Sequence, residues 1–254
     1  MSASPPKLYV ATPAYGCLVN TSYLASLLNL QIACARRGIS VVFDIIGNES
    51  LVQRARCILA ERFAKATDAT HLLFIDADIG FSADAVMNML DADKDVISCV
   101  YPKKNVNWSS IRRKVAEGSK EPLRQMGLDF NINLRGNASK TVNNGLLSVL
   151  DTATGFLLIK RRVIETMKER YRDSLFAVND IHGIHNVSDY VAIFDCMIDP
   201  DSRRYLSEDY AFCRRWQQMD PANEIWIDVR TPLSHTGSSF FSADIRRSAL
   251  AYRE

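Results

Sequence analysis

Short apolar blocks alternate with longer amphipathic stretches along the first 101 residues of the chain. The apolar blocks read as strands, at 8–11, 39–46, 72–76 and 95–101. The stretches between them read as helices, at 20–37, 50–67 and 83–90. Continuous apolar runs are typical of strands that are buried on both faces. The pattern therefore predicts a mostly parallel sheet covered by helices.

Polar and turn-forming residues mark the ends of these elements. Asn20, Ser50 and Ser82 stand where helix N-caps are expected. Gly38 stands just past the end of the first helix, where it is expected to stop it. Pro13 should break the first strand, because proline cannot donate to a strand ladder.

Regular patterning is lost over 102–144, which is polar and longer than a usual connection in a compact domain. The elements expected beyond it are a strand, a turn at Thr154-Gly155, a strand and a helix over 146–171, then a strand at 192–198, a helix from Ser207 to Met219 and a strand at 224–229. We therefore expect a single α/β domain over 1–254, with a smaller antiparallel part. Its regions are 1–101, a variable loop region at 102–144, and 145–254.

Composition gives no global indication of a nucleic-acid or membrane partner. Lys and Arg number 31 against 29 Asp and Glu, a formal charge of +2. The six cysteines form no CxxC pair, and no segment approaches the roughly 18 apolar residues of a membrane span. The N-terminal residues also lack the apolar stretch of a signal peptide. We therefore expect a cytoplasmic protein with reduced thiols, no membrane span and no nucleic-acid partner.

A local basic excess lies within the variable region. Residues 102–125 carry an excess of five positive charges, with Trp108 as the one aromatic residue after Tyr101. Nucleic-acid binding would need more stacking side chains than this. We prefer a loop that orders on binding a donor diphosphate or an acceptor.

Two acids, Asp76 and Asp78, follow the apolar block at 72–75. Ligand sites in parallel α/β sheets lie off the carboxyl ends of the strands. Closely spaced carboxylates suit Mg²⁺ or Mn²⁺, which take further ligands from substrate phosphates. The structural alternative is that Asp78 and Asp84 merely begin the next helix, where acids complement the helix dipole.

A second acid pair, Glu208 and Asp209, opens the helix that follows Ser207. Acids in the first turn stabilise a helix by about 0.3–1 kcal/mol each, so a structural explanation is sufficient on its own. A catalytic role is the alternative.

The order and spacing of seven segments together resemble a small GT-A-fold glycosyltransferase of the stand-alone type found in large DNA viruses, including those of algae, in phages and in bacteria. The segments are TPAYG, LVQRARCILAERF, THLLFIDADIGF, DVISCVYPKK, TGFLLIKRRV, SEDYAFCRRW and IDVRTPLSHTG. The resemblance implies a Rossmann-like GT-A domain, with 1–101 as the nucleotide-binding half and 145–254 as the acceptor-binding half. It also implies a host cytoplasmic location if the protein is viral.

The resemblance implies a metal-dependent transfer from a nucleoside-diphosphate sugar, UDP-linked or GDP-linked, to a glycan or glycoprotein acceptor. Asp78 would bind Mn²⁺ or Mg²⁺ on the diphosphate, with His235 as the second protein ligand. Asp76 would contact the ribose or the sugar. A metal across the two phosphates would neutralise the charge that develops on the leaving nucleoside diphosphate. The structural alternative for His235 is an ordinary surface or core histidine.

Further residues are expected to contact the nucleotide sugar. The full set is Thr12, Pro13, Ala14, Tyr15, Asp44, Arg54, Arg56, Asp76, Ala77, Lys103, Thr154 and Gly155. Asp44 would face the base or ribose from the end of the second strand. Arg54 and Arg56 point about 200° apart on a helix, so they cannot both face one ligand head-on. The family usually has Asn where this chain has Cys57.

Several of these residues have purely structural alternatives. The segment around Tyr15 makes a good turn in any case, and the two arginines suit a solvated helix face. Gly155 would allow close approach to a sugar, or would form a hairpin turn with Thr154.

In inverting enzymes of this family the acid of such a motif removes the acceptor proton, so Asp209 is the expected base and Glu208 the residue that positions hydroxyl groups. In a retaining enzyme Asp209 would be a binding residue and would not act as the base.

Other functional classes compete with the glycosyltransferase. A domain that binds nucleotide or glycan without turnover has the same sequence features. An aspartyl phosphatase also ends a strand with DxD, but it needs Thr or Val where this chain has Gly80. The chain contains neither GxGxxG nor GxxxxGK, which weighs against a dehydrogenase or a P-loop enzyme.

Overall fold

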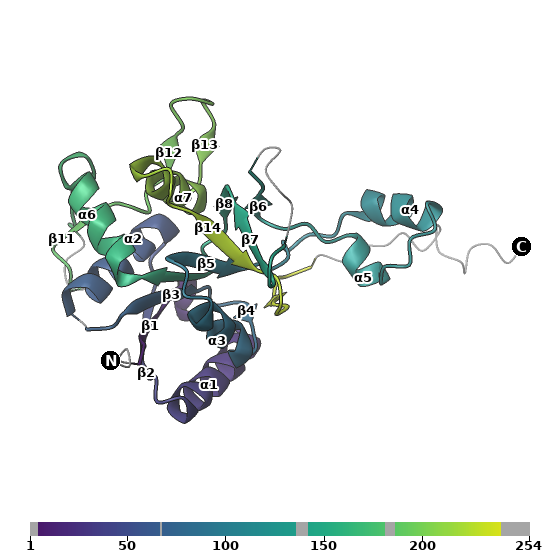
Figure 1. The fold of residues 1–254 in the computed structure, drawn as a ribbon, viewed down its shortest axis with the longest axis horizontal. Helices are drawn as coiled ribbons and strands as arrows, with labels where there is room; N and C mark the ends of the chain where they lie inside the picture. Colours follow the sequence, from purple (N-terminus) through teal and green to yellow (C-terminus); the bar gives the residue numbers. More distant parts are fainter. Residues whose placement is uncertain (1–4, 67, 136–141, 181–185, 240–254) are drawn as a thin grey trace, which may run out of the picture.

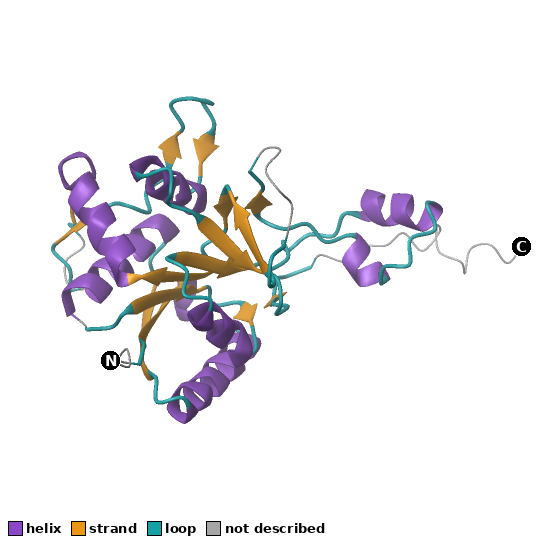
Figure 2. Cartoon of the chain, in the orientation of Figure 1, coloured by secondary structure: helices purple, strands orange, loops and turns teal. Residues whose placement is uncertain are grey.

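A seven-stranded sheet forms the centre of the computed structural model, which describes residues 5–66, 68–135, 142–180 and 186–239 (Figures 1 and 2). In spatial order the strands are β2 (Ser40–Gly47), β1 (Lys7–Ala14), β3 (His71–Ile75), β9 (Phe156–Lys160), β5 (Val96–Cys99), β14 (Ile225–Asp228) and β7 (Leu146–Val149). All of them run in one direction except β9 and β7. The carboxyl ends of β1 and β3 therefore meet at one edge.

Helices cover both faces of this sheet. On one face lie α1 (Thr21–Arg36) and α3 (Ala83–Asp91), and on the other lie α2 (Val52–Ala66), α6 (Arg161–Leu175) and α7 (Glu208–Met219) (Figure 1). In β3 the side chains of Leu72 and Phe74 pack with the second group, and those of Leu73 and Ile75 with the first. Both sides of the strand are thus buried, which explains its continuous apolar run.

In the part of the chain that the structure describes, four short antiparallel pairs lie outside the central sheet. They are β4 (Ile79–Gly80) with β15 (Ser234–His235), β6 (Ile132–Asn133) with β8 (Asp151–Thr152), β10 (Phe176–Val178) with β11 (Asp189–Val191), and β12 (Met197–Ile198) with β13 (Tyr205–Leu206). The expectation of a mostly parallel sheet with a smaller antiparallel part is confirmed.

The variable region contains structure that the sequence pattern did not predict. Two helices, α4 (Trp108–Ala116) and α5 (Leu123–Met126), form an arm that projects from the body (Figure 1). The side chain of Asn107 caps α4 by accepting a 3.0 Å hydrogen bond from the Ser110 amide. Neither helix packs on the sheet, so their sequences lack a wide apolar face. Residues 136–141 lie outside the described part.

Three predicted boundaries are wrong. The first strand continues through Pro13 to Ala14, because β3 pairs with β1 only up to Ala11 and the proline has β2 alone beside it. Helix α2 begins at Val52 rather than after Ser50.

The third error is the strand expected at 192–198. Irregular chain with a turn at Ile193 and Phe194 occupies most of it, and only Met197–Ile198 is a strand. The run looked like a strand because Ile193 and Phe194 are buried in the core.

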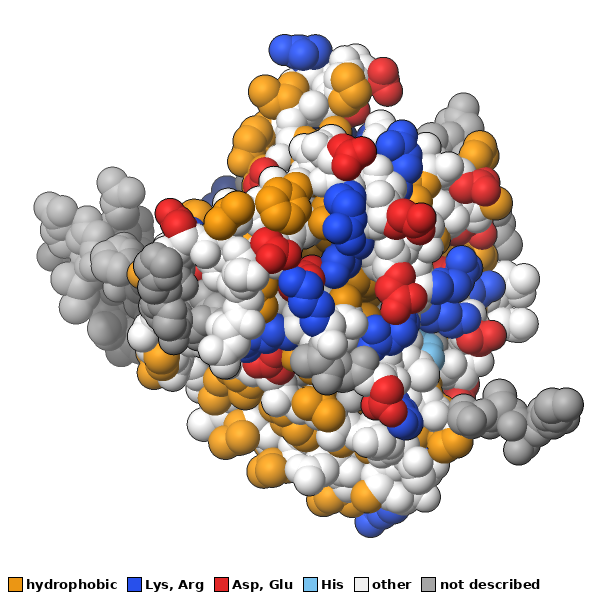
Figure 3. Space-filling view, turned by 90° about the vertical axis from the view of Figure 1, so that its left-hand side faces the viewer, with side chains coloured by type: hydrophobic (Ala, Val, Ile, Leu, Met, Phe, Trp, Pro, Cys, Tyr) orange, Lys and Arg blue, Asp and Glu red, His pale blue; other side chains and the backbone are white. Residues whose placement is uncertain are grey.

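The face that Figure 3 shows is the side on which α2 and α6 lie. Basic and acidic side chains mix across its middle, and hydrophobic side chains gather below them. On α2 and α6, Glu61 pairs with Lys65 at 2.9 Å and with Lys168 at 2.6 Å. Among the described residues, no helix is long and apolar enough to cross a bilayer.

Leu158 on β9 tests the importance of the antiparallel strand at the centre of the sheet. Its side chain is 1% exposed, so Leu158→Ala should lower the free energy of unfolding by about 2–5 kcal/mol in urea denaturation. The same substitution at Leu123 on α5, which is 62% exposed, should change it by less than about 0.5 kcal/mol. Equal losses at the two positions would contradict this placement of the core.

Candidate functional site

A cleft of ≈ 880 Å³ opens where β1 and β3 end and α7 begins. Its lining comes from segments far apart in the chain: Pro13, Tyr15, Leu18, Val19, Asn20, Glu49, Ser50, Val52, Arg56, Asp76, Ala77, Asp78, Tyr101, Lys103, Lys104, Asn131, Glu208, Asp209 and His235. Both predicted acid pairs therefore lie in the same cleft.

Arg56 on α2 links the two acid pairs. Its guanidinium donates to Asp76 at 2.9 Å and to Glu208 at 3.5 Å, and it lies 5.4 Å from the ring centre of Phe74. The residue is only 2% exposed. Burial by itself would lower the pKa of Arg56, but Asp76, Asp209 and Glu208 outweigh it and raise that pKa. Arg56 therefore stays charged and neutralises part of a strongly acidic site.

Asp209 lies in the first turn of α7, next to Glu208 and close to Arg56. Burial, followed by the negative charge of Glu208, raises the pKa of Asp209 to about 7, while Arg56 acts in the opposite direction. Its Oδ1 atom is buried without a hydrogen-bond partner in the described structure, as is Nη1 of Arg56. Asp209 is thus a carboxyl group able to exchange a proton near neutral pH.

Gly155 allows the backbone to approach the acids closely. The Gly155 amide donates to the Tyr101 hydroxyl at 3.1 Å, and its carbonyl accepts from the Asp76 amide at 2.9 Å. A Cβ at this position would lie 2.3 Å from the Tyr101 oxygen and 2.5 Å from Oδ2 of Asp76. Only glycine fits here without displacing one of them.

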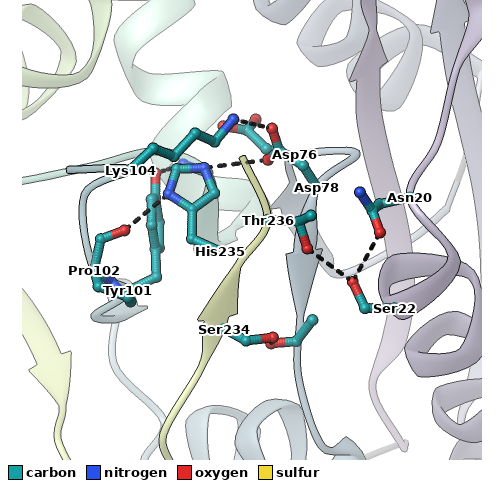
Figure 4. A network of polar contacts seen from close by, with 12 residues as sticks. Asn20, Ser22, Asp76, Asp78, Tyr101, Pro102, Lys104, Ser234, His235 and Thr236 are labelled. Atoms are coloured by element: carbon teal, nitrogen blue, oxygen red, sulfur yellow. Dashed lines mark hydrogen bonds and ion pairs between the residues drawn. The ribbon is translucent and has the colours of Figure 1, made fainter. Parts of the chain in front are cut away.

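Asp78 and His235 face each other across the mouth of the cleft (Figure 4). Nε2 of His235 lies 3.3 Å from Oδ1 of Asp78, and Nδ1 lies 2.8 Å from the carbonyl oxygen of Pro102. Because a carbonyl only accepts, Nδ1 carries the proton and Nε2 is the ring nitrogen that faces the carboxylate. Asp78 also bonds the ammonium group of Lys104 through Oδ2.

Strand β15 explains how a histidine close to the C-terminus reaches Asp78. His235 pairs with Ile79 in the short β4–β15 sheet, and the Thr236 amide donates to the Asp78 carbonyl at 2.9 Å. The Thr236 hydroxyl also contacts Ser22 at 3.3 Å (Figure 4). Backbone pairing thus fixes both metal-ligand candidates.

The Asp78 and His235 pair fits a divalent cation. A carboxylate oxygen opposite an imidazole nitrogen suits Mn²⁺, and a metal-binding histidine usually donates its other N–H to a carbonyl, as His235 does to Pro102. Within the described ranges no group of three or more His, Cys, Asp or Glu side chains is arranged to hold a metal. Two protein ligands leave positions that substrate phosphates and water usually fill.

Most of the predicted site residues come together. Those that line the cleft are Pro13, Tyr15, Arg56, Asp76, Ala77, Asp78, Lys103, Glu208, Asp209 and His235. Thr12, Ala14 and Thr154 are buried and do not line it. Thr12 bonds the Tyr23 hydroxyl at 2.5 Å, so it supports the turn rather than facing the cleft.

The structure does not bring Asp44 to the cleft. Strand β2 continues to Gly47, so Asp44 does not end it as expected. The carboxylate accepts hydrogen bonds from the Tyr9 hydroxyl and, at 2.8 Å, from Arg62. The contacts of Asp44 with Tyr9 on β1 and Arg62 on α2 thus explain where this carboxylate points.

Arg54 also lies outside the lining of the cleft. Its guanidinium forms two 2.8 Å hydrogen bonds with Glu49, which in turn accepts from the Leu51 amide at 2.9 Å. Of the three arginines on α2, only Arg56 lines the cleft.

The sequence predicted no place in the site for nine other residues of the lining, namely Leu18, Val19, Asn20, Glu49, Ser50, Val52, Tyr101, Lys104 and Asn131. A signal existed for Lys104, because it stands beside Lys103 in the basic segment. The sequence placed Tyr101 only at the end of the strand predicted at 95–101. Its contact with Gly155 depends on the order of the strands in the sheet, which the sequence pattern does not give.

Comparison with known proteins places the fold. No protein-family model and no curated protein matches the chain. The crystal structure of A197 from STIV matches with a TM-score of 0.50 and 15% identity, over 92% of this chain and 86% of that chain. The crystal structure of GalNAc-T7 with UDP, GalNAc and Mn²⁺ matches with a TM-score of 0.42 and 12% identity, over 92% of this chain and 44% of that chain.

At these identities such a likeness concerns the fold alone. The mixed seven-stranded sheet and the likeness to A197 confirm the expected α/β fold, which is a GT-A-like Rossmann fold.

Gly155, predicted to contact the donor, does not line the cleft, and Gly155→Ala tests its close approach to Tyr101 and Asp76, which do. The added Cβ should lower the free energy of unfolding by about 1–3 kcal/mol, because Tyr101 or Asp76 must shift. Tyr101→Phe removes the nearest atom, so in the double variant it should recover part of that loss. Denaturation of the four proteins in a double-mutant cycle measures the coupling. Strict additivity of the two substitutions would contradict the contact.

Proposed function

We propose that this chain is a metal-dependent glycosyltransferase that moves a sugar from a nucleoside diphosphate, expected to be UDP, to a hydroxyl of a glycan or glycoprotein. The observation that carries the proposal is the assembly of two acid pairs in one cleft. Asp78 lies beside His235 at the mouth, and Asp76, Glu208 and Asp209 surround a buried arginine.

In the proposed reaction Asp78 and His235 would hold a divalent cation, and such a cation would supply positive charge to neutralise the diphosphate. Asp76 binds a hydroxyl of the ribose or the sugar, and its ion pair with Arg56 at 2.9 Å fixes its orientation. The ring of Tyr15, at the end of β1, is 75% exposed and available to the base. Lys103 adds positive charge to the same cleft.

Asp209 is the proposed base. The acceptor oxygen forms a bond to the anomeric carbon as the bond from that carbon to the diphosphate breaks. The hydroxyl proton passes to the Asp209 carboxylate, and the nucleoside diphosphate leaves. A pKa of about 7 suits this task, because the carboxylate is both available and basic near neutral pH. Glu208 raises that pKa and positions the hydroxyl group.

A screen of nucleotide sugars tests the proposal. Each nucleotide sugar is added to the full chain with and without Mn²⁺. Thermal stabilisation of the protein and slow hydrolysis of the nucleotide sugar are recorded. We expect one donor to stabilise and to be cleaved only when Mn²⁺ is present, because binding to the folded state raises the melting temperature. Stabilisation without hydrolysis, even with added acceptors, would favour a domain that only binds.

Asp78→Asn tests the metal ligand. The amide keeps the shape but loses the ligand charge, so the Mn²⁺-dependent part of donor binding should disappear in calorimetry. Asp84→Asn, a matched change in the first turn of α3, should leave it intact. Unchanged metal dependence in Asp78→Asn would leave this acid only its contacts with Lys104 and His235.

A further inference from the structure

Lys104 places a positive charge on the carboxylate that the proposed function assigns to the metal. Its ammonium group bonds Oδ2 of Asp78, while Oδ1 faces His235 at 3.3 Å (Figure 4). One carboxylate therefore serves both a lysine and the proposed cation site. The side chains of Lys104 and Asp78 are 40% and 33% exposed, so solvent reaches the pair.

Two contacts hold Lys104 in place, one made by its neighbour in the chain and one by its own side chain. The amide of the preceding residue, Lys103, donates to the Asp129 carbonyl at 2.8 Å. The stem of Lys104 lies against Gly237, where an added Cβ would be 2.9 Å from the lysine Cδ. Gly237 follows His235 by two residues. The lysine therefore runs along the same segment that supplies the second proposed metal ligand.

A divalent cation between Asp78 and His235 would lie within a few ångströms of the lysine ammonium, and the two positive charges would repel each other. A partly exposed ion pair contributes little net free energy, so the cation can displace the lysine reversibly. The long flexible stem then keeps the ammonium group inside the cleft. There the ammonium group can pair with a donor diphosphate in place of Asp78.

We propose that Lys104 exchanges partners when the donor binds: it holds Asp78 in the ligand-free protein and turns to the diphosphate once a divalent cation occupies Asp78 and His235. This inference rests on the proposed function. Lys104 thereby competes with the cation before donor binding and strengthens the diphosphate site afterwards.

The test compares Lys104→Gln with the parent by titrating Mn²⁺ alone into the nucleotide-free full chain. Mn²⁺ should bind the variant about threefold to tenfold more tightly, because no ion pair must break first. The difference should shrink at high salt, which screens the pair in the parent. Lys103→Gln is the matched control, since it removes the same charge from a neighbouring residue of the cleft that does not pair with Asp78.

A second titration adds UDP at saturating Mn²⁺. Lys104→Gln should now bind UDP about tenfold more weakly than the parent, since one charged phosphate contact is lost. Matching denaturation curves for the parent and both variants establish that all three are folded.

The outcomes separate this inference from the proposed function. Equal Mn²⁺ affinity of the parent and Lys104→Gln would overturn the exchange but leave the metal site in place. If UDP binds the parent equally well without Mn²⁺ and Lys104→Gln loses that binding, Lys104 is a permanent cation and the exchange is wrong. Failure of all three proteins to bind Mn²⁺ would reject the proposed metal site and the exchange with it.

Discussion

The buried guanidinium of Arg56 is the interaction on which the cleft depends. Three carboxylates from two distant parts of the chain approach it, two from the start of α7 and one from the end of β3. Acids so close together are costly to keep ionised unless a cation lies among them. Arg56 contributes that cation from α2, and its partners cannot separate without leaving a charge unpaired. The same arrangement holds the pKa of Asp209 at about 7, between burial and Glu208, which raise it, and Arg56, which lowers it.

The mouth of the cleft is built differently. Asp78 and His235 are fixed by backbone pairing between β4 and β15, and the carbonyl of Pro102 orients the imidazole. Their side chains remain partly exposed, at 33% and 15%. The acids around Arg56 thus lie beside a pair of potential metal ligands that solvent and ions can reach. This division suits a reaction in which a cation and donor enter from solvent and a proton is transferred in the interior.

The sequence predicted the elements with continuous apolar runs and clear caps, such as β3 and α1, because local pattern alone determines them. It also predicted Asp78, Asp209 and His235 as one site, but only through the resemblance of ordered motifs. The arm α4–α5 was missed since neither helix packs on the sheet. Asp44 was misplaced because its partners, Tyr9 on β1 and Arg62 on α2, are brought to it only by the tertiary structure. The contact of Lys104 with Asp78 depends on tertiary structure that the spacing of residues does not encode.

The pH profile of donor cleavage tests the central claim most directly. Turnover at saturating donor and Mn²⁺ is measured from about pH 5 to about pH 9 in the parent and in Asp209→Asn. Because a base acts only when deprotonated, parent turnover should rise with pH and level off above a midpoint near the Asp209 pKa of about 7. Asp209→Asn should lose this rise and turn over about 10²–10⁴-fold more slowly, with unchanged donor affinity. A variant that keeps both the rate and the profile of the parent would contradict the account.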